Sequence, residues 1–159
     1  MTIRVATKND LPAILRMASA MIDYHNSLDN YYKSPEEFKN LEEMMAGDLD
    51  DKDVTLLVAE ENGKILGYIR GVVEASPEYI KPKKIGVVYD AFVEKSQRES
   101  GIGKQLFEEL KKWFATKKVK HLELSVDARN SGGIAFWKKL GFSDYKLRLR
   151  QNLLMTNDQ

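Results

Sequence analysis

Hydrophobic and polar positions change their period several times along the 159-residue chain. Alternation over Thr2 to Ala6 predicts an opening strand. A capping box at Ser34 to Glu37, with a proline at its first helical position, predicts a helix that ends near Gly47. Another helix is predicted between the opening strand and the capping box. Its apolar residues have the spacing of one helical face: Leu11, Ile14, Leu15, Ala18 and Ile22. The polar segment His25 to Lys33 is expected to be the loop between these helices.

The middle of the chain has the pattern of a hairpin followed by a buried strand. Val54 to Glu60 and Lys64 to Glu74 flank Asn62-Gly63, the strongest two-residue signal for a hairpin turn. Residues 85 to 94 are apolar on both faces in their middle part, which is typical of a central strand that is covered on both sides.

The last third of the chain mixes both periods. Residues 102 to 116 predict a helix, residues 119 to 126 a strand, and residues 130 to 140 a helix closed by Gly141. Phe142 to Leu154 alternates and predicts a final strand. The resulting order, β-α-α-β-β-β-α-β-α-β, predicts an α/β (α+β) fold with a mixed, mostly antiparallel sheet and helices on both faces, in a single domain over residues 1–159.

The composition is that of one ordinary globular domain, with 43% hydrophobic and 31% charged residues. The net charge of +1 gives no reason to expect nucleic acid as a partner. The chain has no cysteine, which excludes disulfides, thiolate metal sites and a cysteine nucleophile. The apolar runs are too short to span a membrane, and the first residues have the pattern of a strand and not of a signal peptide. We therefore expect a cytoplasmic protein with no membrane partner.

The stretch from Gln97 to Leu106 holds two glycines, Gly101 and Gly103, between a central strand and a helix. Glycines there let the backbone bend tightly and leave no Cβ in the way of a ligand. The first N–H groups of a helix have no partners within it, so they attract an anion such as a phosphate. A plain tight turn is the alternative. The P-loop and dinucleotide-binding patterns both fail, because Gln105 and Leu106 stand where those motifs need other residues.

The remaining pattern, Arg98-x-x-Gly101-x-Gly103 after a strand, resembles the coenzyme A signature of the GCN5-related N-acetyltransferase (GNAT) superfamily. The resemblance covers nearly the whole chain. Three further stretches are similar to family members: Ile3-Arg4-Val5-Ala6-Thr7 with Asp10-Leu11, the Asn62-Gly63 hairpin with Ile65-Leu66-Gly67-Tyr68, and Asn130 to Phe142. The resemblance implies a GNAT-like acyl-CoA-binding domain that transfers an acyl group, usually acetyl, to an amine.

For the cosubstrate, acetyl-CoA, the resemblance implies three contact regions and no metal. Phe92 and Val93, at the end of the central strand, would pair with the pantetheine arm, and a backbone N–H there would polarise the thioester carbonyl. Asn130 matches the family asparagine on the pantetheine side. The missing cysteine fits direct attack by the amine in a ternary complex. Backbone N–H groups of the glycine stretch would hold the pyrophosphate, at Arg98, Glu99, Ser100, Gly101, Ile102, Gly103 and Lys104.

Proton transfer is where the sequence departs from the family pattern. The family often protonates the leaving thiolate from a tyrosine on the last helix, but Trp137 holds that position here. An indole N–H cannot supply a proton near neutral pH, so Trp137 is interpreted as a wall of the thioester pocket or as core. For the base the family often uses a carboxylate on the central strand, which makes Asp90 the first candidate and Glu94 the second. Tyr89 lies where some members place a glutamate, and a purely structural hydrogen bond is the alternative role of Asp90.

The acceptor is expected to be a small-molecule or protein amine, and a homodimer is left open. Tyr24, Tyr31 and Tyr32 could enclose such an amine or simply pack. The acidic residues Asp48, Asp50, Asp51 and Asp53 could attract a cation but are interpreted as a solvated turn, and His25 is read as isolated. Two other readings remain, a coenzyme A-binding regulatory module without catalysis and a scaffold whose glycine turn binds nothing.

Overall fold

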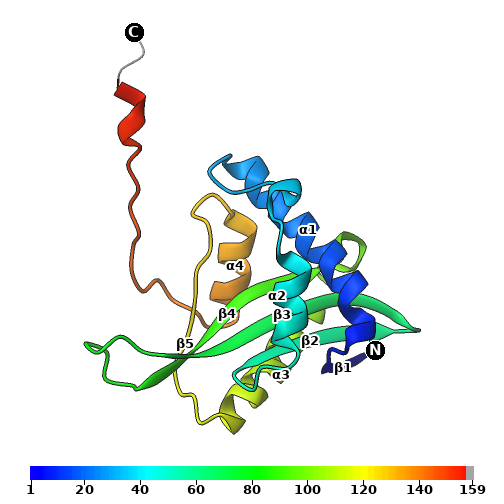
Figure 1. The fold of residues 1–159 in the computed structure, drawn as a ribbon. Helices are drawn as coiled ribbons and strands as arrows, with labels where there is room; N and C mark the ends of the chain where they lie inside the picture. Colours follow the sequence, from blue (N-terminus) through cyan, green and yellow to red (C-terminus); the bar gives the residue numbers. More distant parts are fainter. Residues whose placement is uncertain (157–159) are drawn as a thin grey trace. The chain divides into compact units, whose positions relative to one another are not determined.

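The computed structural model describes residues 1–156 of the chain (Figure 1). The chain separates into two compact units, one from Met1 to Ser125 and one that begins at Val126, and each is described by itself. The single acyl-CoA-binding domain expected over residues 1–159 stays a prediction. Within the described residues, no helix has both the length and the apolar surface needed to cross a membrane.

The first unit is built on a five-stranded sheet in which the order of the strands is the order of the chain, β1-β2-β3-β4-β5. Neighbouring strands are antiparallel except β4 and β5, which run parallel. The sheet is therefore mixed and mostly antiparallel, as predicted. The strands are β1 (Thr2–Val5), β2 (Val54–Glu61), β3 (Lys64–Ala75), β4 (Lys84–Val93) and β5 (Leu122–Leu124).

The turn between β2 and β3 has the conformation that the sequence predicts. Asn62 and Gly63 both have positive φ angles, 51° and 76°, which a two-residue hairpin turn of the favoured kind requires. The hairpin pairs Glu61 with Lys64, and an irregularity between Ala59 and Glu60 then shifts the register by one residue, so that Val58 lies opposite Tyr68.

Helices cover both faces of this sheet, as predicted (Figure 1). On one face lie α1 (Leu11–Leu28) and α2 (Leu41–Asp48), whose buried residues pack with Val58 and Tyr68 in one hydrophobic cluster. On the other face lies α3 (Ile102–Thr116). Gly71 of β3 lets this helix approach closely, because a Cβ there would lie 2.5 Å from a methyl carbon of Leu110.

Two helix boundaries differ from the sequence prediction. The first helix continues through the polar segment to Leu28. The capping box at Ser34 starts only a short 3₁₀ turn, Pro35–Glu37, and α2 begins at Leu41. The position of α2 follows packing instead of capping, because Met45 is the residue of α2 that is buried in the core.

The second unit contains α4 (Ser131–Lys139), which Gly141 follows with a left-handed φ of 101°. The final strand predicted over Phe142 to Leu154 is not formed. Residues 142–152 have neither helix nor strand, and a short 3₁₀ helix spans Leu153–Thr156. A strand needs hydrogen-bonded neighbours as well as an alternating pattern, and the alternation of this segment does not supply them.

A partly buried ion pair connects the start of α1 to the edge of the sheet. Asp10 is only 6% exposed, and its two carboxylate oxygens accept hydrogen bonds of 2.7 and 2.9 Å from the guanidinium of Arg4. The Asp10 carboxylate also accepts a 2.7 Å hydrogen bond from the backbone N–H of Thr7. The hydrogen bonds from Arg4 lower the pKa of Asp10 below its ordinary value, although burial acts in the opposite direction.

Replacing Asp10 by asparagine is expected to lower the free energy of unfolding by about 1–3 kcal/mol at pH 7, because it leaves the guanidinium underpaired. A carboxyl group with a lowered pKa stabilises the fold above its unfolded pKa and loses that effect as the pH falls through its folded pKa. The difference between wild type and Asp10→Asn should therefore shrink below about pH 4. Urea unfolding at pH 7 and pH 3 measures it. Glu109→Gln, which removes a surface pair with Lys112, is the control, and an equal loss in both variants would contradict the assignment.

Candidate active site

A β-bulge places two consecutive side chains of β4 beside one arginine of β3. Arg70 lies opposite Asp90 and Gly71 lies opposite Val88, so Tyr89 is the extra residue in the ladder. The Arg70 guanidinium lies over the Tyr89 ring, 5.2 Å from its centroid. The positive charge of Arg70 also acts on the carboxylate of Asp90. The bulge thus gathers two predicted catalytic residues, Tyr89 and Asp90, around Arg70.

Asp48 fixes the position of Arg70. It accepts hydrogen bonds of 2.7 and 3.2 Å from the Nε and an Nη of Arg70. The two side chains are only 10% and 13% exposed, so this ion pair is largely shielded from water. The interpretation of Asp48 as part of a solvated turn is wrong, because the end of α2 carries it onto the sheet. The signal in the sequence was Arg70 itself, since a cation within a buried strand needs a partner.

The carboxylate of Asp90 sits in a polar cluster with a net negative charge. Burial raises its pKa above the ordinary value for aspartate, and the negative charge of Asp48 raises it further. The positive charge of Arg70 and the presence of His25 oppose this shift without cancelling it. A raised pKa makes Asp90 a better proton acceptor than an exposed aspartate, which is what a general base requires. His25, read as isolated in the sequence, thus belongs to the surroundings of Asp90, and its ring lies 5.5 Å from that of Tyr32.

Beneath this cluster lies a residue that the sequence analysis did not assign to the site. Tyr68 is fully buried, and its hydroxyl has no hydrogen-bond partner among the described residues. Burial raises the pKa of Tyr68, and the charge of Asp90 raises it further, so the hydroxyl stays protonated. Its only signal in the sequence was a phenol at an inward position of an apolar strand.

The other two predicted catalytic residues are already engaged. The hydroxyl of Tyr89 donates a hydrogen bond to Glu74, which raises the pKa of Tyr89 and makes it unsuitable as a base. Glu94 pairs with Arg16 of α1 at 2.8 Å. Both Glu94 and Arg16 line a hollow of about 710 Å³ past the end of β4. Of the three candidates, Asp90 has the surroundings that best fit proton transfer.

The strands β4 and β5 separate beside this cluster. Their parallel pairing covers Gly86 to Val88 on β4 and Leu122 to Leu124 on β5. From Tyr89 to Val93, β4 continues alone on that side, within the part of the chain that the structure describes. This edge of β4 is therefore open to an extended ligand up to Val93, whose carbonyl already accepts a hydrogen bond from Arg98.

The N-terminus of α3 follows directly after β4 and is open. Gly101 precedes the helix with a left-handed φ of 86°, and no side chain caps the first turn. Glu99 also has a positive φ, 66°, which is uncommon for a residue with a side chain. Ile102 is buried and anchors the turn. The N–H groups of Ile102 to Lys104 thus form an uncapped helix start suited to an anion.

Arg98 links this helix start to the end of β4. Its Nε donates a 3.0 Å hydrogen bond to the carbonyl of Val93, and its guanidinium lies 5.3 Å from the centre of the Phe92 ring. Arg98, Phe92 and Val93, all predicted cosubstrate contacts, are therefore neighbours. The hydroxyl of Ser100 turns back to the carbonyl of Gln97, which tightens the loop.

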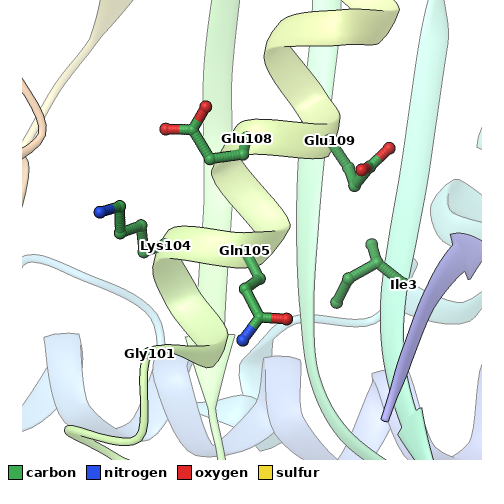
Figure 2. Close-up of a pocket in the computed structure, with 6 residues that line it drawn as sticks. All are labelled: Ile3, Gly101, Lys104, Gln105, Glu108 and Glu109. Atoms are coloured by element: carbon green, nitrogen blue, oxygen red, sulfur yellow. The ribbon is translucent and has the colours of Figure 1, made fainter.

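A groove of about 390 Å³ begins at the same helix start (Figure 2). Gly101 and Lys104 form one end of its lining, and Ile3 of β1 faces Gln105 and Glu109 across it. Glu108 and Glu109 pair with Lys111 and Lys112, at 3.0 and 2.6 Å. The end at Gly101 and Lys104 is thus the one that favours a negatively charged ligand.

The second unit holds the remaining two predicted contacts. Asn130 caps α4, because its side-chain oxygen accepts a 2.9 Å hydrogen bond from the N–H of Gly133. The Trp137 ring packs against Phe136 and Phe142, at centroid distances of 4.8 and 5.5 Å. Their predicted roles toward the cosubstrate stay predictions. The structure shows no group of three or more metal-ligating side chains placed to hold an ion within residues 1–156.

Comparisons with known proteins agree with this arrangement. A model of the acetyltransferase (GNAT) family matches residues 20–142. An uncharacterized N-acetyltransferase of Bacillus subtilis, YhfO, is 24% identical over 144 residues, which cover 91% of each chain. A mutant of the BH1408 protein from Bacillus halodurans is 26% identical, with a TM-score of 0.86 over 97% of this chain and all of that one.

A more distant solved structure is the aminoglycoside N-acetyltransferase AAC(6')-Iy in complex with a bisubstrate analogue, CoA-S-monomethyl-acetylneamine. It is 16% identical, with a TM-score of 0.75 over 95% of this chain and 96% of its own. At that identity the likeness shows a shared fold.

Proposed function

Since the chain belongs to the acetyltransferase (GNAT) family and is an N-acetyltransferase, we propose that it transfers acetyl from acetyl-CoA to an amine by direct attack in a ternary complex. One observation carries this proposal. The free edge of β4 leads into an uncapped, glycine-entered helix start, so an extended strand-like arm and a phosphate group would find adjacent sites. The bisubstrate complex of AAC(6')-Iy supports the cosubstrate, because it joins coenzyme A to an amine acceptor on the same fold.

At the phosphate end, the residues present fit a pyrophosphate. The N–H groups of the first turn of α3 have no side-chain cap, and Gly101 precedes them with a left-handed φ of 86° and no Cβ in the way of a ligand. Lys104 adds a positive charge at the same end of the groove (Figure 2). Arg98 connects the loop to the end of β4 through its contacts with Val93 and Phe92. Asn130 and Trp137 are proposed as contacts on the pantetheine and thioester side.

At the reacting end, the bound cosubstrate supplies an acyl thioester. A backbone N–H at Phe92 or Val93 polarises its carbonyl. Asp90 first takes a proton from the acceptor ammonium, directly or through a water molecule, which frees the lone pair of the nitrogen. The neutral amine attacks the carbonyl carbon, the C–S bond breaks, and the sulfur leaves with the electron pair as a thiolate. The second proton that the nitrogen loses as the amide forms passes to solvent. The low basicity of a thiolate lets it leave without an acid at the position of Trp137.

Consumption of acetyl-CoA by the purified chain with a panel of amines tests this function. The panel contains an aminoglycoside, a polyamine and a peptide with a free N-terminus, and the thiol released is measured. We expect release that depends on one of the amines, together with a rise in melting temperature on addition of coenzyme A alone. A melting temperature that coenzyme A leaves unchanged would contradict the cosubstrate. A rise without release by any amine would favour a binding module.

A further inference from the structure

Asp90 lies opposite an arginine but is not bonded to it. Asp90 of β4 and Arg70 of β3 are partners in the strand ladder, and the charge of Arg70 acts on the Asp90 carboxylate. Even so, within the described residues this carboxylate accepts no hydrogen bond and forms no ion pair. A carboxylate that faces a guanidinium away from water normally pairs with it. The unpaired state of Asp90 therefore needs a cause.

A second carboxylate, that of Asp48, occupies the guanidinium instead. Asp48 stands at the end of α2 and accepts hydrogen bonds of 2.7 and 3.2 Å from the Nε and an Nη of Arg70. These two nitrogens form a side of the guanidinium that binds one carboxylate through two parallel hydrogen bonds. The ring of Tyr89 lies over the face of the same guanidinium. Arg70 is thus held toward α2, and Asp48 and Asp90 compete for it.

Asp10 shows what an arginine does to a carboxylate that it binds in this protein. Its two oxygens accept hydrogen bonds of 2.7 and 2.9 Å from Arg4, and its pKa lies below the ordinary value. The pKa of Asp90, which no arginine binds, lies above the ordinary value. Burial raises the pKa of both groups, so the hydrogen bonds from arginine account for the opposite result at Asp10.

We propose that Asp48 is a positioning residue for acetyl transfer: it holds the Arg70 guanidinium in its own ion pair and so keeps Asp90 free to accept the proton of the acceptor ammonium. Without Asp48, the guanidinium turns to Asp90 and makes that carboxylate its partner. A carboxylate bound in this way is a poor base, because its charged form is already stabilised. This inference rests on the proposed function, in which Asp90 is the base.

The groups that can influence Asp90 come from four elements. They are His25 of α1, Asp48 of α2, Tyr68 and Arg70 of β3, and the neighbouring Tyr89 of β4. Burial and Asp90 raise the pKa of the Tyr68 hydroxyl, which stays protonated, and a guanidinium stays charged. The hydroxyl of Tyr89 is bonded to Glu74. His25 and Asp48 are therefore the groups whose effects on Asp90 must be separated by variants.

The state of Asp90 can be measured without any substrate. In a carboxyl NMR titration of wild type, the Asp90 signal, identified by its absence from Asp90→Asn, should titrate at a higher pH than that of Asp10. In Asp48→Asn it should move to lower pH by at least about one pH unit, the effect typical of a carboxylate that gains an arginine partner. Asp50→Asn, at an exposed carboxylate two positions further on, is the matched control and should leave the signal unchanged. An Asp90 titration that Asp48→Asn does not lower would overturn the inference.

A crystal structure of Asp48→Asn distinguishes a moved guanidinium from the mere loss of a negative charge. It should show a guanidinium nitrogen of Arg70 within about 3 Å of an oxygen of Asp90. A guanidinium that keeps its wild-type position, with Asp90 still unbonded, would overturn the competition even if the titration has shifted.

Turnover tests the consequence for catalysis. With an accepted amine, Asp48→Asn should lower kcat at pH 7 at least about tenfold, because the base is partly lost, and should move the acid limb to lower pH. The double variant Asp48→Asn/Arg70→Met should recover much of this kcat, because no guanidinium remains to bind Asp90. His25→Gln should preserve the difference between wild type and Asp48→Asn. A double variant no more active than Asp48→Asn is what a merely structural ion pair predicts, and it would overturn the inference.

Failure of the proposed function gives a different set of results. If no amine releases thiol, but the Asp90 titration and the Asp48→Asn structure are as expected, the competition for Arg70 is supported and acetyl transfer is what fails. If Asp90→Asn lowers turnover while Asp48→Asn keeps the kcat and the acid limb of wild type, the base is supported and the role of Asp48 is overturned.

Discussion

Asp90→Asn is expected to lower turnover at pH 7 by about 10²-fold or more, the range typical of a lost general base. An acceptor amine with a pKa near that of lysine is almost entirely protonated at pH 7, so it needs help to lose its proton. Asparagine keeps the shape of Asp90 and its place opposite Arg70, but it cannot accept that proton. The loss should shrink toward high pH, where free amine is already abundant.

The pH profile of turnover distinguishes this role from a structural one. Burial and Asp48 raise the pKa of Asp90, so its basic form is present above that raised value and is lost as the pH falls through it. Wild-type turnover should fall on the acid side with this titration, and Asp90→Asn should lack that limb. Asp50→Asn, at an exposed carboxylate, controls for the exchange of acid for amide. An Asp90→Asn enzyme with the wild-type profile would remove Asp90 from the mechanism, and a matching loss in Glu94→Gln would transfer the role to Glu94.

Gly101→Val is expected to weaken coenzyme A binding at least tenfold, about 1.4 kcal/mol, while the fold survives. At a φ of 86° a branched side chain strains the backbone, and the loop must shift to relieve it. No atom outside the loop lies within 4 Å of a Cβ at this position, so the effect should fall on the ligand and the local backbone.

Gly63→Val is the control that distinguishes weaker coenzyme A binding from a general loss of stability. Gly63 has a φ of 76° in the β2–β3 turn, and its Cβ would also lie in open space. Both variants should lose comparable stability in thermal unfolding, because both place a branched side chain on a residue with positive φ. Calorimetric titration with coenzyme A should then show weaker binding for Gly101→Val alone. Equal affinities in the two folded variants would show that the helix start is not the phosphate site.

The elements that the sequence predicted well are those with local signals. The Asn62-Gly63 turn fixes the hairpin, and the apolar spacing of α3 gives its bounds, Ile102–Thr116, directly. The tight turn at Gly101 has a local signal too, because the glycine itself permits its left-handed φ of 86°, while its role toward a phosphate stays a prediction. Where a turn or a helical face is encoded within a few residues, the local preference and the tertiary packing favour the same conformation.

The parts that the sequence could not give depend on residues far apart in the chain. Asp48 and Arg70 are 22 positions apart, and nothing in the pattern near Asp48 indicates a buried ion pair. Tyr68 acquired a place beneath Asp90 only through the register of β3 and β4. The final strand failed for a related reason, because alternation shows that a segment can pair but not what it pairs with.

The strand order of the sheet also determines how much conformational entropy the chain loses when each pair of strands forms. Pairing β2 with β3 closes a turn of two residues, Asn62 and Gly63, between Glu61 and Lys64. Pairing β1 with β2 brings Val5 to Leu57 and closes a loop of about 50 residues, which costs roughly 2–3 kcal/mol more in chain entropy. Pairing β2 with β3 therefore loses little chain entropy, whereas pairing β1 with β2 loses much more. The ion pairs of Arg4 with Asp10 and Glu60 lie where that cost is largest, and they help to hold the most distant strand in place.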